Sequence, residues 1–209
     1  MKRQSGFVAL CGLLCGVAWA STFAFHSTWS NPSARPIELS GSKMAVVFMS
    51  SDPVQRREAE EVLVRELGRH GIQALPSQPI LPSQGGGDMS AMLSRFAESG
   101  INTVLVMRVL GQGASLSAHL PPYFIVPPPW EYRWLSLYWG YGWGIVQQPA
   151  YLQTDTAISI ETLVYSLPRD RLVWGGRSWP AHRYQIPELT AQLGDLVTTQ
   201  MSRDGALKP

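Results

Sequence analysis

An alternation of buried-strand and amphipathic-helix patterns over residues 43–111 restricts the fold more than any other feature of the sequence. Compact, valine-rich runs such as KMAVVFMSS are typical of strands that are covered on both faces. Asp52 and Pro53 are residue types that begin helices, and Gly71 is one that ends them. The predicted order is strand 43–51, helix from Asp52 to Gly71, strand 72–77, helix 89–99 after Asp88, and strand 102–111. Short strands joined by helices predict parallel pairing with right-handed crossovers.

The first of these helices has an apolar stripe that includes Ala59, Leu63 and Leu67 at helical spacing. We expect this stripe to face the core and the charged residues to lie on a solvated face, because they fall largely outside the stripe. These charged residues are Arg56, Arg57, Glu60, Glu61 and Arg65.

The second half of the chain changes to an antiparallel pattern. TDTAISIETLVYSL (154–167) alternates with a period of two, PRDR has turn chemistry, and LVWGGRSW (172–179) predicts the return strand. Glu161 would then stand opposite Arg177 as a cross-strand ion pair. A helix is predicted to open at Ile186. The expected fold is α/β (α+β): a mixed sheet of about five strands with three helices, in the order β-α-β-α-β, antiparallel hairpin, C-terminal helix.

The first twenty residues resemble a secretory leader. Lys2 and Arg3 precede an apolar run from Phe7 to Val17, and the sequence Ala-Trp-Ala ends at Ala20. We expect cleavage after Ala20; the alternative is a membrane anchor retained over residues 7–25. The predicted domain organisation is a signal peptide at 1–20, an extended N-terminal segment at 21–42, one α/β domain at 43–204 with an aromatic and proline-rich insertion at 112–150, and a fraying tail at 205–209.

The cysteine content and the net charge limit the kinds of binding partner that we expect. Cys11 and Cys15 both lie in the leader, each after a leucine, which is a poor context for lipid attachment, so the mature chain would hold no thiol. The chain has 17 basic and 15 acidic residues, and two of the basic ones belong to the leader, so the mature chain would be neutral. Neutrality without a basic run argues against nucleic acid as a partner. Secretion predicts a periplasmic location, peripheral to the outer membrane at most.

A search for catalytic groups finds few candidates. His26, His70, His119 and His182 are not spaced as joint metal ligands, so no metal and no cofactor is expected. One alternative remains in the form of a hydrolase that uses His119 or His182 with Glu161 or Asp155. Such an enzyme would require those groups to converge within hydrogen-bonding reach in a pocket. We therefore expect a protein that is not an enzyme.

The strings YWGYGWG and TAISIETLVYSLPRDRLVWGGRS resemble a bacterial domain family of unknown function found in small cell-envelope lipoproteins. The family pattern is a Gly/Trp/Tyr-rich patch followed by a hairpin whose return strand carries Leu-Val-Trp, here Leu172–Trp174. The resemblance is best over residues 138–178 and loose over the rest of the mature chain. It implies an envelope location and an α/β fold, and it brings no catalytic residues. The chain departs from the family in lacking a good lipidation site.

The aromatic residues between 130 and 143 are the candidate binding residues: Trp130, Trp134, Tyr138, Trp139, Tyr141 and Trp143. Three interpretations stay open. The segment packs on its own sheet, with LYWGYGWG as a strand edge; or it forms a contact surface for an envelope protein or the outer membrane; or it is a platform for envelope glycan such as peptidoglycan. The function predicted from these residues is a non-enzymatic envelope binding or assembly module that acts through the aromatic segment.

Overall fold

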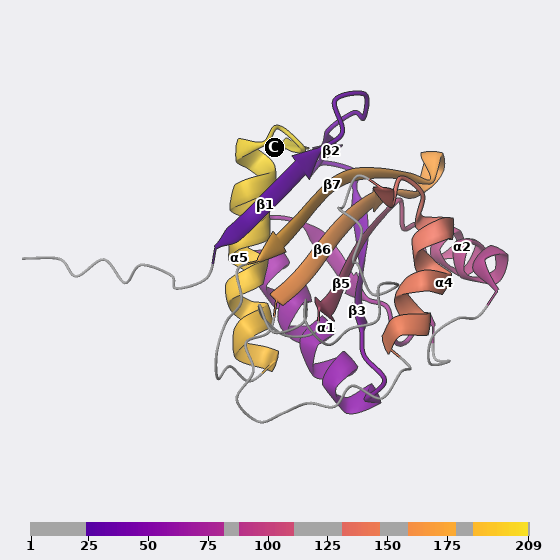
Figure 1. The fold of residues 1–209 in the computed structure, drawn as a ribbon. Coiled ribbons are helices and arrows are strands. Elements are labelled where there is room, and N and C mark those ends of the chain that lie inside the picture. The colour runs from indigo at the N-terminus through magenta and orange to yellow at the C-terminus, as the bar shows by residue number, and fades with distance from the viewer. Residues whose placement is uncertain (1–23, 82–87, 111–130, 147–158, 179–185, 209) are drawn as a thin grey trace, which may run out of the picture.

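A computed structural model describes residues 24–81, 88–110, 131–146, 159–178 and 186–208. These residues form a six-stranded mixed sheet in the order β1-β7-β6-β5-β3-β4, with helices on both faces (Figure 1). The strands are β1 (Phe25–Ser30), β3 (Lys43–Met49), β4 (Gln73–Pro76), β5 (Thr103–Leu110), β6 (Ser159–Ser166) and β7 (Arg171–Ser178). The helices are α1 (Pro53–Arg69), α2 (Met89–Glu98), α4 (Leu135–Val146) and α5 (Ile186–Arg203). The predicted α/β class is confirmed, and the described residues alone contain one more strand in the main sheet and one more helix than expected.

The parallel half of the sheet forms as its local signals indicate. Asp52 caps α1 by accepting hydrogen bonds from the backbone N–H groups of Val54 and Gln55, and Asp88 caps α2 through Ser90 N–H. Gly71 ends the first helix at a positive φ of 78°, which glycine adopts without a steric penalty. Strand β3 pairs in parallel with both β4 and β5, whereas β6 and β7 form the predicted antiparallel hairpin.

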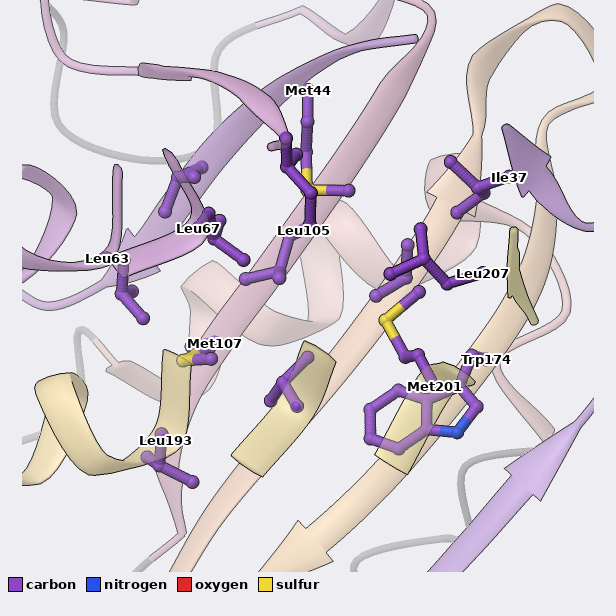
Figure 2. Close-up of a cluster of buried hydrophobic side chains, with 14 of the residues drawn as sticks. Ile37, Met44, Leu63, Leu67, Leu105, Met107, Trp174, Leu193, Met201 and Leu207 are labelled. Carbon is purple, nitrogen blue, oxygen red and sulfur yellow. The ribbon is translucent and has the colours of Figure 1, made fainter. Parts of the chain in front are cut away.

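Two hydrophobic layers cover the sheet. Residues of β3 and β5 alternate between the layers, so that Met44 and Leu105 face α1 and α5 while Val47 and Val106 face α2 and α4. Figure 2 shows the first layer, where Leu63 of α1 and Leu193 and Met201 of α5 gather over Met107 and Trp174 with the other labelled side chains. Burial on both faces explains the continuous apolar runs of the central strands.

The two ends of the described chain meet, which corrects two expectations. Strand β1 lies in the 21–42 segment and pairs antiparallel with β7, so this segment is part of the sheet. Strand β2 (Ile37–Glu38) pairs in parallel with β8 (Leu207–Lys208), and both Ile37 and Leu207 are buried. The prediction of a fraying tail was wrong because Leu207 closes one edge of a hydrophobic layer that residues 37 and 174 share.

Two of the α1 charges that were predicted to lie on a solvated face are also buried. Arg56 and Glu60 are 2% and 0% exposed. The Arg56 Nε lies 3.0 Å from Glu60 Oε1, and the Ser77 hydroxyl bonds to both side chains at 2.7 Å. Glu60 also accepts from the backbone N–H of Phe48 at the end of β3. This cluster ties α1 to the ends of β3 and β4, so its polar atoms are satisfied inside the protein.

Candidate contact site at the aromatic helix

The aromatic segment forms a helix, not the expected strand edge. Helix α4 contains no charged residue, and its cap comes from a distant turn. Asp170 accepts hydrogen bonds from Leu135 N–H at 2.8 Å and from the Ser136 hydroxyl at 2.7 Å. The short 3₁₀ helix η3 (Leu167–Arg169) and a left-handed Asp170, with φ of 44°, place this carboxylate at the helix N-terminus. Residues far apart in the sequence therefore determine where α4 begins.

Most rings of the segment point into the second hydrophobic layer. Tyr138, Trp139 and Trp143 are at most 5% exposed, and the two indoles pack edge to face with centroids 5.9 Å apart. The prediction that these three rings form an exposed contact surface was therefore wrong, because the inner face of α4 covers the sheet. Tyr141 is half-buried, Trp134 is exposed, and Trp130 lies outside the described residues. The interpretation of packing on the protein's own sheet is correct for the inner face.

A buried guanidinium anchors this inner face. Arg108 of β5 is 1% exposed and lies 5.1 Å from the ring centroid of Tyr141, 5.3 Å from that of Tyr138 and 6.0 Å from that of Tyr132. Its Nε is 2.7 Å from Glu161 Oε2. The helix is thus held to the sheet through one cation that three rings surround.

Glu161 joins three adjacent strands. The strand register places it beside both Arg108 of β5 and Arg177 of β7. Its Oε1 accepts from Arg177 Nε at 3.0 Å and Nη2 at 2.9 Å, which confirms the predicted cross-strand pair. The Tyr138 hydroxyl donates to Oε2 at 3.1 Å. The second arginine that contacts Glu161, the buried Arg108, was missed because only the sheet order reveals that β5 neighbours β6.

The protonation states of this cluster follow from its burial. Burial raises the pKa of Tyr138 well above its ordinary value, and it likewise raises the pKa of Tyr132 and Tyr165. Burial by itself would lower the pKa of Arg108, but Coulombic interactions with Tyr138 and Glu161 outweigh it, and the pKa rises. The phenols therefore stay protonated and the guanidinium stays charged near neutral pH, which is the behaviour of a structural cluster.

The hydrolase alternative gains no support from the described residues. Both oxygens of Glu161 are engaged by arginines, and the residue is fully buried. His119, His182 and Asp155 lie outside the described residues. His70 pairs with Asp195 at 3.0 Å on the surface, and no group of three potential metal ligands occurs in the part of the chain that the structure covers. No described helix is long and apolar enough to cross a membrane.

The outer face of α4 differs from the inner one. Trp134 at its start is 43% exposed and Leu137 is 58% exposed, and with Val54 they are the exposed large hydrophobic residues among those described. A Cβ atom added at Gly140 or Gly144 would meet no atom within 4 Å. The outer surface of the helix is therefore apolar around Trp134 and Leu137, and at the two glycines no side chain projects from it. We call Trp134, Leu137, Gly140 and Gly144 the outer face of α4.

Similarity to known proteins is found among solved structures. No model of a protein family matches the chain, and no curated protein does. Among solved structures, the PelC dodecamer from Paraburkholderia phytofirmans is similar with a TM-score of 0.45 and 12% identity, over 87% of this chain and 96% of that chain. A variant of that dodecamer is similar with a TM-score of 0.43 and 10% identity, over 83% of this chain and 96% of that chain.

Proposed function

We propose that the mature chain is a non-enzymatic binding or assembly module of the bacterial cell envelope and that the outer face of α4 is its contact surface. The observation that carries the proposal is the exposure of Trp134, which directly precedes α4, and of Leu137 in the first turn of this helix, which contains no charged residue. Exposed apolar patches on otherwise polar surfaces are typical of contact sites. The proposal includes an envelope location, which the leader supports. It also includes membership of the envelope domain family, which the resemblance over residues 138–178 supports.

The partner is a protein that presents an apolar helix. Gly140 and Gly144 are helix-interior glycines with open space above them, and each costs about 1 kcal/mol relative to alanine in an exposed helix. Packing inside this chain does not require them, in contrast to Gly142, where a Cβ would lie 2.6 Å from Met49 Sδ. Small residues four apart allow the backbone of a second helix to approach closely. A helix that binds an anionic bilayer would instead carry several basic residues beside its apolar ones, whereas α4 contains none and a single exposed arginine, Arg133, precedes Trp134.

The test places a photo-crosslinking amino acid at position 137 in the intact bacterium that makes this protein, with position 57 on α1 as the matched exposed control. We expect one protein adduct from position 137 that is absent from position 57. Gly140→Leu should abolish it, because the larger side chain fills open space without disturbing the core. Mapping should place the crosslink on an apolar helix of the partner.

Two results would refute this contact surface. Adducts with lipid alone from position 137 would assign the outer face of α4 to a membrane, and equal adducts from both positions would show that the face has no selectivity. The location is tested separately, since mature protein recovered from the envelope should begin at Ser21. A chain that keeps Met1 and is recovered from the cytosol would contradict the envelope assignment. The double change of Trp139 and Trp143 to alanine is unsuitable here, because both rings are buried.

A further inference from the structure

A polar cavity of about 770 Å³ lies at the end of the sheet where β3 and β5 begin. Its walls come from the β1–β2 connection, the β2–β3 connection, η3 and the first residues of β7. These connections lie at the upper end of the sheet in Figure 1. The volume is within the range of small-ligand sites in proteins. The cavity shares no lining residue with the outer face of α4, so a ligand site here is independent of the proposed function.

The charge of the cavity is unbalanced. Arg35, Arg169 and Arg171 line it from two separate segments, and Glu38 is the one acidic residue among its described lining residues. All three arginines are exposed, and none forms an ion pair or a hydrogen bond that the described residues supply. The carboxylate next to them in sequence, Asp170, is directed to the N-terminus of α4 instead. Three arginines without an acidic partner among the described residues therefore line one concave site, which concentrates positive potential there.

The walls that carry these arginines are fixed by other side chains. Asn31 donates to the backbone carbonyl of Leu172 at 3.0 Å and accepts from Ser33 N–H at 3.0 Å. Asn102 donates to the Gly41 carbonyl at 3.0 Å and accepts from Lys43 N–H at 3.1 Å. The two asparagines are thus used to hold the loops in place. A ligand would meet a preformed site and would order mainly the arginine side chains, which lowers the cost of binding.

We propose that this cavity binds a ligand with two or more carboxylate or phosphate groups. The planar guanidinium group donates pairs of hydrogen bonds to either kind of group, and several such contacts are needed because each exposed one contributes little. Three serines that are exposed or half-buried, Ser33, Ser40 and Ser42, also line the cavity, and serine hydroxyls suit the hydroxyls of an acidic sugar. Since carboxylated sugars and phosphates share this chemistry, the experiment has an arm for each.

Isothermal titration calorimetry on the mature protein would use a galacturonic acid hexamer as the carboxylate probe and inorganic triphosphate as the phosphate probe. Maltohexaose is the uncharged probe of matched length. The test variants are Arg169→Gln with Arg171→Gln, and Arg35→Gln alone, which lies on the other wall. The control combines Arg57→Gln and Arg203→Gln, which remove two exposed charges outside the cavity.

We expect at least one anionic probe to bind and maltohexaose not to bind. Kd should rise about threefold to fivefold for each cavity arginine removed, as the loss of one exposed charge pair predicts, and the control should stay within about twofold of the original protein. Far-UV circular dichroism should confirm that all variants are folded. Three results would each overturn the proposal: neither anion binds, maltohexaose binds as well as the hexamer, or the control loses as much affinity as the cavity variants.

Discussion

Glu161→Gln tests the role of the buried cluster beneath α4, because it removes one charge and almost no volume. In the native protein, Glu161 is fully buried, with Arg108 Nε at 2.7 Å and Arg177 Nη2 at 2.9 Å. The side chains of Arg108 and Arg177 are 1% and 14% exposed. A glutamine amide would leave both guanidinium groups without a counter-charge. The NH₂ group of the glutamine is a hydrogen-bond donor, and it would face an arginine N–H group that donates to a carboxylate oxygen in the native protein.

The expected loss is about 3–5 kcal/mol, the usual effect of removing one partner from a buried ion pair. This loss is a large fraction of the roughly 5–15 kcal/mol that stabilises an ordinary domain. With a urea m-value of about 2 kcal/mol/M, the unfolding midpoint should fall by about 2 M. Because α4 rests on Arg108 through the rings of Tyr138 and Tyr141, tryptophan fluorescence, to which the buried Trp139 and Trp143 contribute, should report the transition.

Equilibrium urea unfolding followed by fluorescence and by far-UV circular dichroism measures this loss. Glu61→Gln is the matched control, because Glu61 is exposed on α1 and its replacement should change stability by no more than about 0.5 kcal/mol. A loss of less than about 1 kcal/mol for Glu161→Gln would refute the reasoning. The cluster would then have the energetics of solvent-screened surface pairs.

Two further predictions concern the phenols and the glycines. Burial raises the pKa of Tyr138 and Tyr165, so the folded state keeps phenolic protons that the unfolded chain releases. The stability that these phenols contribute should be complete below a pH of about 10 and should fall above it by about 1.4 kcal/mol per pH unit for each phenol. The tyrosinate absorbance of these two phenols should rise only as circular dichroism is lost. Gly194→Ala should cost about 1–3 kcal/mol in urea unfolding, because its Cβ would lie 2.6 Å from Glu66 Cβ where α5 crosses α1. Gly140→Ala, which meets no atom within 4 Å, should add about 0.5–1 kcal/mol, and equal signs for the two changes would contradict the packing described.

The parts of the fold that could be predicted from the sequence are those with local signals. Asp52 and Asp88 indicate helices through residues two positions away, and the apolar runs of β3 and β5 contain their own evidence of burial. The pairing of Glu161 with Arg177 follows from a hairpin whose turn is visible in the sequence. In each case the determining interactions lie within one or two elements.

The remaining features depend on contacts between distant segments. Helix α4 has three interior glycines and takes its cap from Asp170, so its local propensity argues against the structure that tertiary packing stabilises. The short strands β2 and β8 pair across almost the whole chain. The burial of Glu60 has a signal in the sequence, because Glu60 lies on the same face of α1 as the buried Leu67, two turns later. For the candidate site, the sequence indicated the aromatic segment but not which side of it faces solvent.

Asp170 has a consequence for communication within the molecule. It lies between Arg169 and Arg171 in the sequence, and its carboxylate holds the first turn of α4. A shift of that hairpin corner toward an anion would therefore act directly on the hydrogen bonds that cap the helix. If both proposed sites exist, an occupant of one changes the affinity of the other, and thermodynamic reciprocity makes the two effects equal in size. Asp170 would then couple anion binding at the end of the sheet to partner binding at the outer face of α4.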